Sequence, residues 1–367
     1  MTILLAGGGT GGHLYPGIAV ADALRDRLPD AKSLFLCTAR DIDRVILEPA
    51  GFEYLPQPIV PPRRSVGGLL KFWRSWRETK DMVRRVLRER RPAAVVGLGG
   101  YAAGVAVKLA ALRRIPTVLL NPDVIPGKAN QYLMRYAKAV CCQFAAPQHF
   151  PAEHRDKLKV TGCPIRRDIR HLPPREQAAS RLELDPMLHT LLITGASQGA
   201  VTLNEAMLAL AGSITLNGWQ ILHLAGREHG EAVRRGYREK GIAARVVDFT
   251  AAMADVWAVT DLALSRAGAS SCAELTACGV PSILMPYPFH RDLHQRANAQ
   301  TLADAGAAIL VDDEKDPKKN ADKLRPILES LLYEVPRRQK MSEAARQLGR
   351  PDAADAIAAA VRELVGR

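Results

Sequence analysis

The chain has 367 residues, of which 47% are hydrophobic and 24% charged. This length predicts two domains of ordinary size, and the composition is that of a soluble folded enzyme and excludes a disordered chain. The net charge of +13 predicts an anionic partner, which could be nucleic acid, an anionic membrane surface or a phosphorylated substrate. Because only 5% of the residues are aromatic, stacking on single-stranded nucleic acid is disfavoured.

The N-terminal residues and the cysteines indicate where the protein works. Met1–Ala6 has no positively charged start and only a short apolar run, so it predicts a first β-strand and not a signal peptide. No apolar stretch approaches the roughly 20 residues that a membrane-spanning helix needs. The six cysteines lack C-x-x-C and zinc-ligand spacing. We therefore expect buried thiols in a reducing cytoplasm and no metal.

Short apolar runs alternate with amphipathic stretches in the first half of the chain. Strands separated by helices predict βαβ units and a parallel sheet that is covered on both faces. The strands are expected at Ile3–Ala6, Ser33–Cys37, Ala93–Leu98 and Pro116–Leu120.

A Pro- and Arg-rich segment, Gly162–Glu183, is the candidate linker. The alternation restarts at Thr190–Thr194, followed by the turn Gly195–Ala200 and a helix. Each half thus opens with a strand, a glycine-containing turn and a helix, which predicts two Rossmann-like, doubly wound α/β domains facing a central cleft. The expected bounds are 1–163 and 164–345, with a C-terminal helix in 346–367 that packs back on the first domain.

The first turn, Gly7–Gly12, matches G-x-G-x-x-G, so its backbone N–H groups and the following helix N-terminus suit an anion. A dinucleotide site also needs an acidic residue at the end of the second strand. That strand ends in Leu36–Ala39 without a carboxylate, so NAD is disfavoured. His13 follows the turn, and a histidine there tends to stay neutral and suits a general base. A lone histidine can equally have a structural role.

Two segments with acidic residues resemble metal sites in their composition. His290, Asp292 and His294 alternate, but they follow prolines in a predicted loop, and Arg291 would oppose a cation. We therefore favour a polar sugar-binding role for this segment. Asp312–Glu314 is expected to be a solvated turn.

The segment Arg63–Arg91 carries eleven basic and three acidic residues. Apolar residues recur among them at helical spacing, which is the pattern of a cationic helix that lies in a membrane interface. The alternative is that the apolar stripe packs on the sheet while the arginines are solvated or bind nucleic acid. The residues expected to contact the membrane are Leu69, Phe72, Trp73 and Trp76.

An ordered set of motifs along almost the whole chain resembles the MurG family of peptidoglycan N-acetylglucosaminyltransferases, in glycosyltransferase family 28. A glycine-rich turn alone is weak support, whereas the order of the motifs is specific. The motifs are Gly9–Ala21, Gly99–Tyr101, Gly127, Asn130, Gly162–Arg166, Gly195–Ala200, Arg266–Glu274, His294-Gln295 and Asn298-Ala299.

The resemblance implies a GT-B fold and an inverting transfer of N-acetylglucosamine without a metal or other cofactor. The donor would be UDP-N-acetylglucosamine, and the acceptor the C4 hydroxyl of undecaprenyl-pyrophosphoryl-N-acetylmuramoyl-pentapeptide. The protein would be peripheral on the cytoplasmic side of the bacterial cell membrane and serve cell-wall synthesis, cell shape and division, with no nucleic-acid partner. The alternative is a related GT-B transferase that uses a UDP-sugar and a different lipid acceptor.

The resemblance also implies roles for individual residues. His13 would be the base, Asn130 would belong to the substrate site, and Arg166 would add charge near the nucleotide. Thr10, Gly11 and Gly12 would face the donor and acceptor phosphates. The diphosphate would be bound by Ser197, Gln198 and Gly199, and the uracil by Phe249, Thr250 and Met253. The ribose would lie along Ala269, Ser270, Ser271, Cys272, Ala273 and Glu274, and the sugar would be bound by His294 and Gln295.

The chain departs from the family after the strand at Pro116–Leu120. The family carries His-Glu-Gln-Asn where this sequence has Leu120-Asn121-Pro122-Asp123. The glutamate is lost and Asp123 replaces an asparagine, so acceptor positioning and assistance of His13 by Asp123 are open. Thr250 and Cys37 replace the usual isoleucine and glycine.

Overall fold

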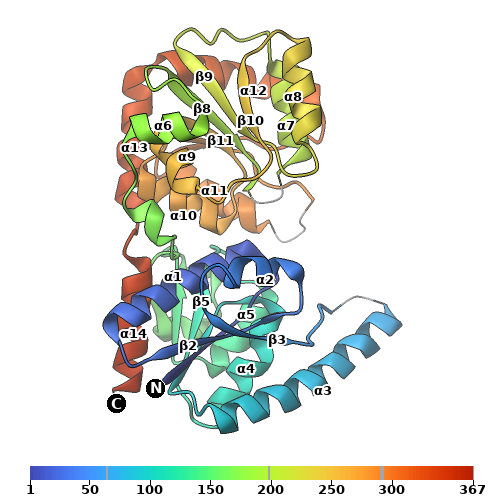
Figure 1. Cartoon of the computed structure of the whole chain (residues 1–367), viewed down its shortest axis with the longest axis vertical. Coiled ribbons are helices and arrows are strands. Elements are labelled where there is room, and N and C mark those ends of the chain that lie inside the picture. The colour runs from blue at the N-terminus through green and yellow to red at the C-terminus, as the bar shows by residue number, and fades with distance from the viewer. Residues whose placement is uncertain (63–64, 197–198, 290–292, 367) are drawn as a thin grey trace. The chain divides into compact units, whose positions relative to one another are not determined.

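The structure is a computed structural model that describes residues 1–62, 65–196, 199–289 and 293–366 (Figure 1). The chain forms two compact units. Met1–Arg166 and Pro351–Arg367 make up the first unit, and Arg167–Arg350 the second. The boundary that we predicted, between residues 163 and 164, lies slightly before the one in the structure, between Arg166 and Arg167. The returning segment was predicted to begin at 346 and begins at Pro351.

The first unit is a seven-stranded parallel sheet in the order β3-β2-β1-β4-β5-β6-β7, covered by helices. Its elements are β1 (Thr2–Ala6), α1 (Gly11–Arg27), β2 (Lys32–Thr38), α2 (Asp41–Leu47), β3 (Glu53–Gln57), α3 (Val66–Glu89), β4 (Ala94–Gly97), α4 (Gly100–Leu112), β5 (Thr117–Asn121), α5 (Lys128–Leu133), β6 (Ala139–Cys142), β7 (Leu158–Val160) and α14 (Ala353–Val365).

The central strand β1 is buried on both faces. Ile3 and Leu5 belong to one hydrophobic cluster, which includes residues of α1 and α14. Leu4 and Ala6 belong to a second cluster, with residues of α3 and α4. Because successive side chains of a strand point to opposite faces, an uninterrupted apolar run is what a sheet between two helical layers requires.

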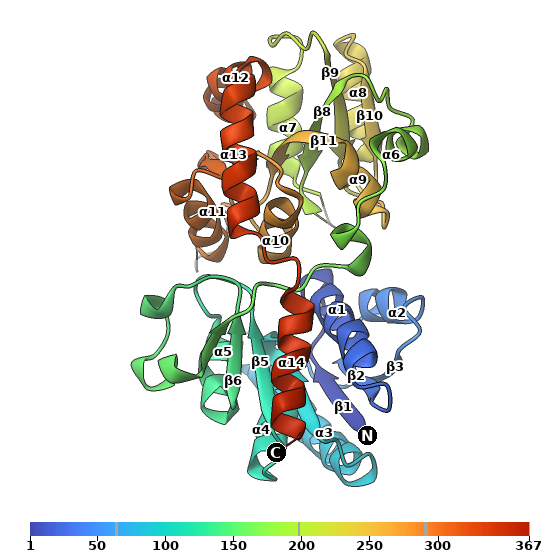
Figure 2. The same cartoon turned by 90° about the vertical axis from the view of Figure 1, so that its left-hand side faces the viewer.

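The last helix, α14, returns to the first unit and packs along α1 (Figure 2). Its residues Ile357 and Val361 are completely buried and share a cluster with Val20 and Leu24 of α1. The first unit therefore needs both ends of the chain to complete its core.

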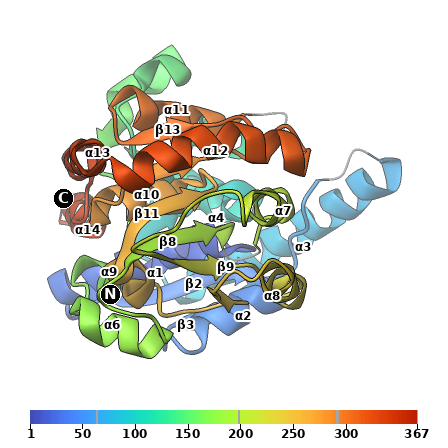
Figure 3. The ribbon, with the colours of Figure 1, turned by 90° about the horizontal axis from the view of Figure 1, so that it is seen from above.

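Helix α3 packs on the first unit from its middle to its C-terminus. Val83, Val86 and Leu87 near its C-terminus belong to the core of the first unit. Its first turns, before the buried Ser75, stand clear of the rest of that unit (Figures 1 and 3). The Ser65 hydroxyl caps this end by accepting a hydrogen bond from the Gly68 N–H group at 3.1 Å. Within the described ranges, no helix is long and apolar enough to cross a bilayer.

The second unit is a six-stranded parallel sheet in the order β10-β9-β8-β11-β12-β13, with helices around it. The doubly wound α/β fold that we predicted is thus confirmed for both units. Its elements are α6 (Arg175–Leu182), β8 (His189–Thr194), α7 (Val201–Leu210), β9 (Trp219–Leu224), α8 (Gly230–Glu239), β10 (Ala244–Val247), α9 (Met253–Val259), β11 (Thr260–Ser265), α10 (Ala269–Cys278), β12 (Ser282–Leu284), α11 (His294–Asp304), β13 (Ala308–Leu310), α12 (Pro317–Tyr333) and α13 (Val335–Leu348).

The predicted linker over Gly162–Glu183 was too long. Part of this segment folds as α6, which belongs to the second unit and packs against α9. The sequence shows no clear helical pattern here, because only three residues of the helix are buried, namely Ala178, Ala179 and Leu182. The prolines before it mark its beginning, since Pro174 is the residue that precedes its first turn.

Candidate active site

The C-terminal edge of the first sheet gathers several of the predicted site residues. Strand β1 leads into the turn 7–10, β4 into Gly99, and β5 into Pro122-Asp123. These three strands are neighbours in a parallel sheet, so the loops after them lie at one edge. That edge is where open α/β sheets bind ligands.

His13 is the third residue of α1, and its ring lies against the glycines at the start of α4. A Cβ atom at Gly100 would come within 3.3 Å of His13 Nε2, and both Gly99 and Gly100 have positive φ angles. The Nδ1 atom is shielded from solvent. Burial lowers the pKa of His13 below 6.5, although the Asp123 carboxylate, a hydrogen bond with the Leu98 backbone and the Asp43 carboxylate act in the opposite direction.

Two buried amides hold the loop that carries Asp123. The Asn130 Nδ2 group donates hydrogen bonds to the Leu120 carbonyl and to Asn121 Oδ1, both at 3.0 Å. Asn121 Nδ2 in turn donates to the Asp123 carbonyl at 2.7 Å. Asn130 Oδ1 lacks a hydrogen-bond partner in the described part of the chain and lies 3.4 Å from an ideal Cβ on Gly99. Asn130 therefore lies near His13, on the other side of Gly99. The Asp123 carboxylate raises the pKa of His13 through its charge.

The start of α1 is open to an anion. Thr10 precedes the helix and its side chain makes no capping hydrogen bond, so Thr10 does not occupy the first N–H groups of the helix through its side chain. Gly12 is exposed, and Gly11 lies against the ring of Tyr15. The Arg166 guanidinium lies 5.0 Å from the centre of the same ring.

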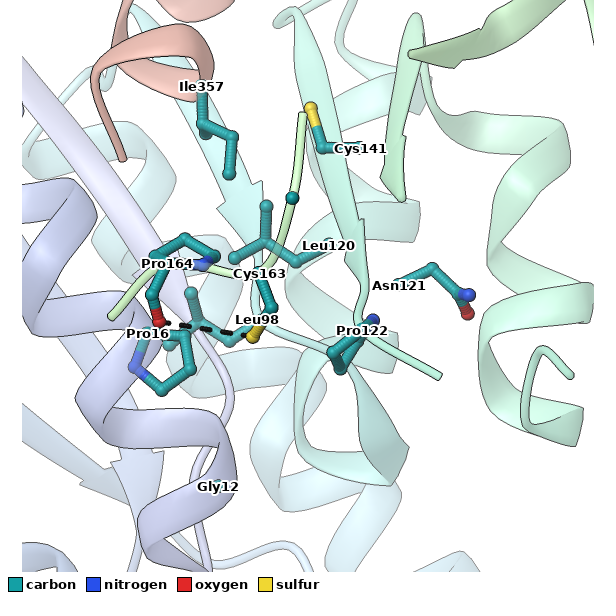
Figure 4. A pocket seen from close by; sticks show the side chains of 11 residues that line it. Gly12, Pro16, Leu98, Leu120, Asn121, Pro122, Cys141, Cys163, Pro164 and Ile357 are labelled. Atoms are coloured by element: carbon teal, nitrogen blue, oxygen red, sulfur yellow. Dashed lines mark hydrogen bonds between the residues drawn. The ribbon is translucent and has the colours of Figure 1, made fainter. Parts of the chain in front are cut away.

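A small, largely apolar pocket lies beside this helix start (Figure 4). It is confined to the first unit, and one wall is the segment Gly162–Pro164, where the Cys163 thiol donates to the Pro164 carbonyl at 3.9 Å. Burial raises the pKa of Cys141 to about 12, so this thiol stays protonated. The lining residues are Gly12, Pro16, Leu98, Leu120, Asn121, Pro122, Cys141, Gly162, Cys163, Pro164 and Ile357.

Asp43 is a feature of this edge that the sequence analysis missed. It lies on α2, is fully buried, and accepts hydrogen bonds from Gly9 and Thr38. The dinucleotide pattern directs attention to a carboxylate at the end of β2, whereas Asp43 comes five residues after Thr38. The sequence offered only the presence of acidic residues in the first turn of the next helix, and their burial became visible in the structure.

The second glycine-containing turn lies between β8 and α7 in the second unit. Ser197 and Gln198, which we assigned to the diphosphate, lie outside the described residues. Gly199 has a φ angle of +73°, and a Cβ atom there would overlap the carbonyl of Ala225. A glycine is therefore required at this position both by conformation and by the closeness of the neighbouring loop.

Asp313 corrects one sequence prediction. We expected Asp312–Glu314 to be a solvated turn, but the Asp313 carboxylate is fully buried. It accepts hydrogen bonds from Arg266 Nη1 at 2.9 Å, Thr202 Oγ1 at 2.5 Å and Asn320 Nδ2 at 2.9 Å. Although burial raises the pKa of Asp313, these hydrogen bonds outweigh it and hold the pKa below its usual value. The prediction failed because two of the partners, Thr202 and Arg266, are distant in sequence.

The predicted uracil and ribose residues lie on α9, α10 and the loop before α9. Glu274 Oε2 accepts a hydrogen bond from Trp257 Nε1 at 2.8 Å. Phe249 and Thr250 are at least partly exposed, and Met253 begins α9. On α10, Ala269, Ser270 and Ser271 are partly exposed. Cys272 and Ala273 are buried, so their side chains face the core.

The predicted sugar-binding residues begin α11. Gln295 Oε1 accepts a hydrogen bond from the Tyr287 N–H group at 3.0 Å, and His294 is the first residue of the helix. His290 and Asp292 lie outside the described residues. Among the residues that the structure does describe, no group of three His, Cys, Asp or Glu side chains could hold a metal ion.

The residues predicted to contact a membrane differ in their surroundings. Trp73 and Leu69 are 58% and 46% exposed, whereas Phe72 is half-buried. Trp76 packs on the core of the first unit, 3.4 Å from the Cβ position of Gly104. Leu70, which we had not included, is 72% exposed.

Two family models match successive parts of the chain. The N-terminal domain model of glycosyltransferase family 28 matches residues 3–142, and the C-terminal domain model of that family matches 190–357. Two curated relatives are both called UDP-N-acetylglucosamine--N-acetylmuramyl-(pentapeptide) pyrophosphoryl-undecaprenol N-acetylglucosamine transferase. The protein of Anaeromyxobacter dehalogenans (strain 2CP-1) is 38% identical, over 100% of this chain and 94% of its own. The protein of Halothermothrix orenii is 34% identical, over 96% of this chain and 95% of its own.

A solved structure extends the similarity to the fold. The MurG crystal structure from Acinetobacter baumannii matches with a TM-score of 0.75, 27% identity and 99% coverage of each chain. The predicted GT-B class, two parallel-sheet α/β domains in one chain, is confirmed by this match together with the two sheets.

Proposed function

The chain belongs to glycosyltransferase family 28, and we propose that it transfers N-acetylglucosamine from UDP-N-acetylglucosamine to undecaprenyl-pyrophosphoryl-N-acetylmuramoyl-pentapeptide. The observation that carries the proposal is whole-length similarity to relatives named for this reaction. The two glycine-containing turns support it, because each offers a helix N-terminus to an anionic group. The product would be the lipid-linked disaccharide-pentapeptide of peptidoglycan synthesis.

His13 is the proposed general base. In an inverting transfer, the C4 hydroxyl of the acceptor attacks the anomeric carbon, the bond to UDP breaks, and the hydroxyl proton must be removed. An imidazole whose pKa is lowered by burial is neutral at pH 7 and can accept that proton. The electrostatic effect of Asp123 stabilises the imidazolium that forms, which is the assistance that we propose for this carboxylate.

The donor is proposed to bind the second unit. Gly199 and the start of α7 would receive the diphosphate, and Glu274 would accept hydrogen bonds from the ribose hydroxyls. Gln295 and His294 would contact the sugar. The role of Arg166 near the nucleotide stays a prediction, as do those of Ser197 and Gln198.

We propose that leaving-group stabilisation comes from helix N-termini and not from a metal ion. Turnover in the presence of EDTA should therefore equal turnover with added magnesium. Loss of activity in EDTA that magnesium restores would contradict this part of the proposal.

The direct test is incubation with radiolabelled UDP-N-acetylglucosamine and the lipid-linked muramoyl acceptor, which should move label into the lipid phase. Donor consumption with another lipid only would favour the related transferase instead. Thermal stabilisation by NAD(H) but not by UDP would favour an oxidoreductase. RNA binding that persists at high salt without UDP-sugar binding would favour a basic binding protein.

We propose that the N-terminal half of α3 contacts an anionic membrane surface on the cytoplasmic side, as a peripheral attachment. Support comes from the exposed apolar side chains Leu69, Leu70 and Trp73 on a helix rich in arginine. Exchanging Leu70 and Trp73 together for serine should lower partitioning onto vesicles with anionic lipid by about tenfold or more.

The matched control for this exchange is Met187→Ser, which removes an 88% exposed apolar side chain from the second unit. The control variant should partition like the unaltered protein. Equal partitioning of the double variant would refute the contact.

A further inference from the structure

The carboxylate of Asp43 joins the glycine-rich turn to the end of β2. Its Oδ1 atom accepts a hydrogen bond from the Gly9 N–H group at 2.7 Å, and Oδ2 accepts from the same group at 3.0 Å. Oδ2 also accepts from the Thr38 N–H group at 2.7 Å and from the Thr38 hydroxyl at 2.8 Å. A buried carboxylate satisfied in this way is bound firmly, because hydrogen bonds to a charged group are the strong ones.

The turn is built to admit this carboxylate. A Cβ atom at Gly8 would overlap Oδ2 of Asp43, so a residue with a side chain there would exclude it. From the other side, Arg40 Nη1 donates to the Gly9 carbonyl at 3.1 Å. Both polar groups of the Gly9 backbone are therefore held by residues at the beginning of α2.

The position of Gly9 is transmitted directly to α1. Gly9 has a φ angle of +86° and precedes Thr10, whose carbonyl accepts hydrogen bonds from the N–H groups of His13 and Leu14, both at 3.2 Å. A run of glycines has large conformational freedom, which must be removed before the helix start has one orientation. Asp43 removes it at the residue adjoining Thr10.

We propose that Asp43 is a positioning residue for sugar transfer. Its carboxylate fixes the backbone at Gly8 and Gly9, and through Thr10 it orients the first turn of α1 and the imidazole of His13. The acceptor then meets a helix N-terminus and a base that are already in place. This inference rests on the proposed function and adds a residue that contacts neither substrate.

The test variant is Asp43→Asn. It keeps the size of the side chain, but the amide nitrogen cannot accept, so a buried N–H or O–H donor loses its acceptor. We expect kcat to fall by about tenfold or more, since small displacements of reacting groups have large effects on rate. The Kd for UDP should change by less than about twofold, because the proposed donor site belongs to the other unit.

The matched control is Asp41→Asn, which removes an exposed carboxylate two residues earlier on the same helix. It should leave kcat unchanged. Hydrogen exchange gives a second readout: in Asp43→Asn the peptide covering residues 7–14 should exchange faster, while peptides from β4 and β5 should not.

The inference is overturned if folded Asp43→Asn turns over at the wild-type rate, or if activity falls only in proportion to the folded fraction. If this variant does not fold, Thr38→Val removes a single donor to Oδ2 and should lower kcat by about threefold; an unchanged kcat would overturn the inference. Wild-type protein that transfers no sugar refutes the proposed function, whereas an active wild type with an unaffected Asp43→Asn refutes only the role of Asp43.

Discussion

The two glycine-containing turns occupy the same place in their units, but different side chains hold the segments beside them. In the first unit, one carboxylate on α2 accepts hydrogen bonds from the backbone of Gly9 and Thr38. In the second, Thr202 in the first turn of α7 joins a buried ion pair between Arg266 and Asp313. The first arrangement joins residues up to 34 apart in sequence, whereas the second connects segments 64 and 111 residues apart.

This difference separates two kinds of sensitivity. Loss of the contacts made by Asp43 should disturb the turn and the residues after it. Loss of the long-range contact should weaken the whole second unit, because Arg266 Nη1 also donates to the carbonyls of Met285 and Pro286. Substitutions on each side can therefore test which turn carries chemistry and which carries donor binding and stability.

The largest expected effect is that of His13→Ala on turnover. Removing the proposed base should lower kcat by roughly 10²–10⁴-fold while the Kd for UDP stays within about twofold. Steady-state kinetics and UDP titration measure the two quantities. His171→Ala, at an exposed histidine, is the control and should behave as wild type. An unchanged kcat in His13→Ala would assign the base to another residue.

Arg266→Met should lower the free energy of unfolding of the second unit by about 3–5 kcal/mol, because Asp313 would remain buried without its cation. Urea unfolding followed by hydrogen exchange in each unit measures this effect. The matched control is Arg296→Met, since Arg296 forms an exposed ion pair with Asp312. That loss should stay within about 1 kcal/mol. Equal losses in the two variants would contradict the structural role of the buried pair.

Glu274→Gln should weaken donor binding with a smaller effect on chemistry. The change keeps the shape of the side chain but removes the negative charge of the carboxylate that would accept hydrogen bonds from the ribose hydroxyls. KM for UDP-N-acetylglucosamine should therefore rise by about tenfold. Glu205→Gln replaces an exposed glutamate on α7 and should leave KM unchanged. An unaltered KM in Glu274→Gln would remove this residue from the donor site.

The smallest effect is expected in the pH dependence. Neutral His13 is the active form of the base, and burial lowers its pKa, so the acid limb of kcat/KM should lie below pH 6.5. The carboxylate of Asp123 raises the pKa of His13, so Asp123→Asn should move this limb to lower pH. A limb that moves to higher pH, or does not move, would contradict the coupling.

The fold could be predicted because strands buried on both faces appear as apolar runs, and the helices between them show helical spacing. The same reasoning identified His13 and the two turns, which are contiguous in sequence. It missed α6, whose buried residues are few, and it placed Asp313 in solvent. Asp43 also escaped notice. Single-sequence patterns do not reveal a buried carboxylate whose donors lie in other elements.

The return of α14 to the first unit has a consequence for how the chain is made. The second unit, Arg167–Arg350, is continuous, so all of its residues can leave the ribosome before the first unit is complete. The apolar face of α1 on which Ile357 and Val361 pack stays uncovered until α14 emerges. The unit begun first is therefore finished last, and a chain that stops after the second unit would carry an incomplete first core.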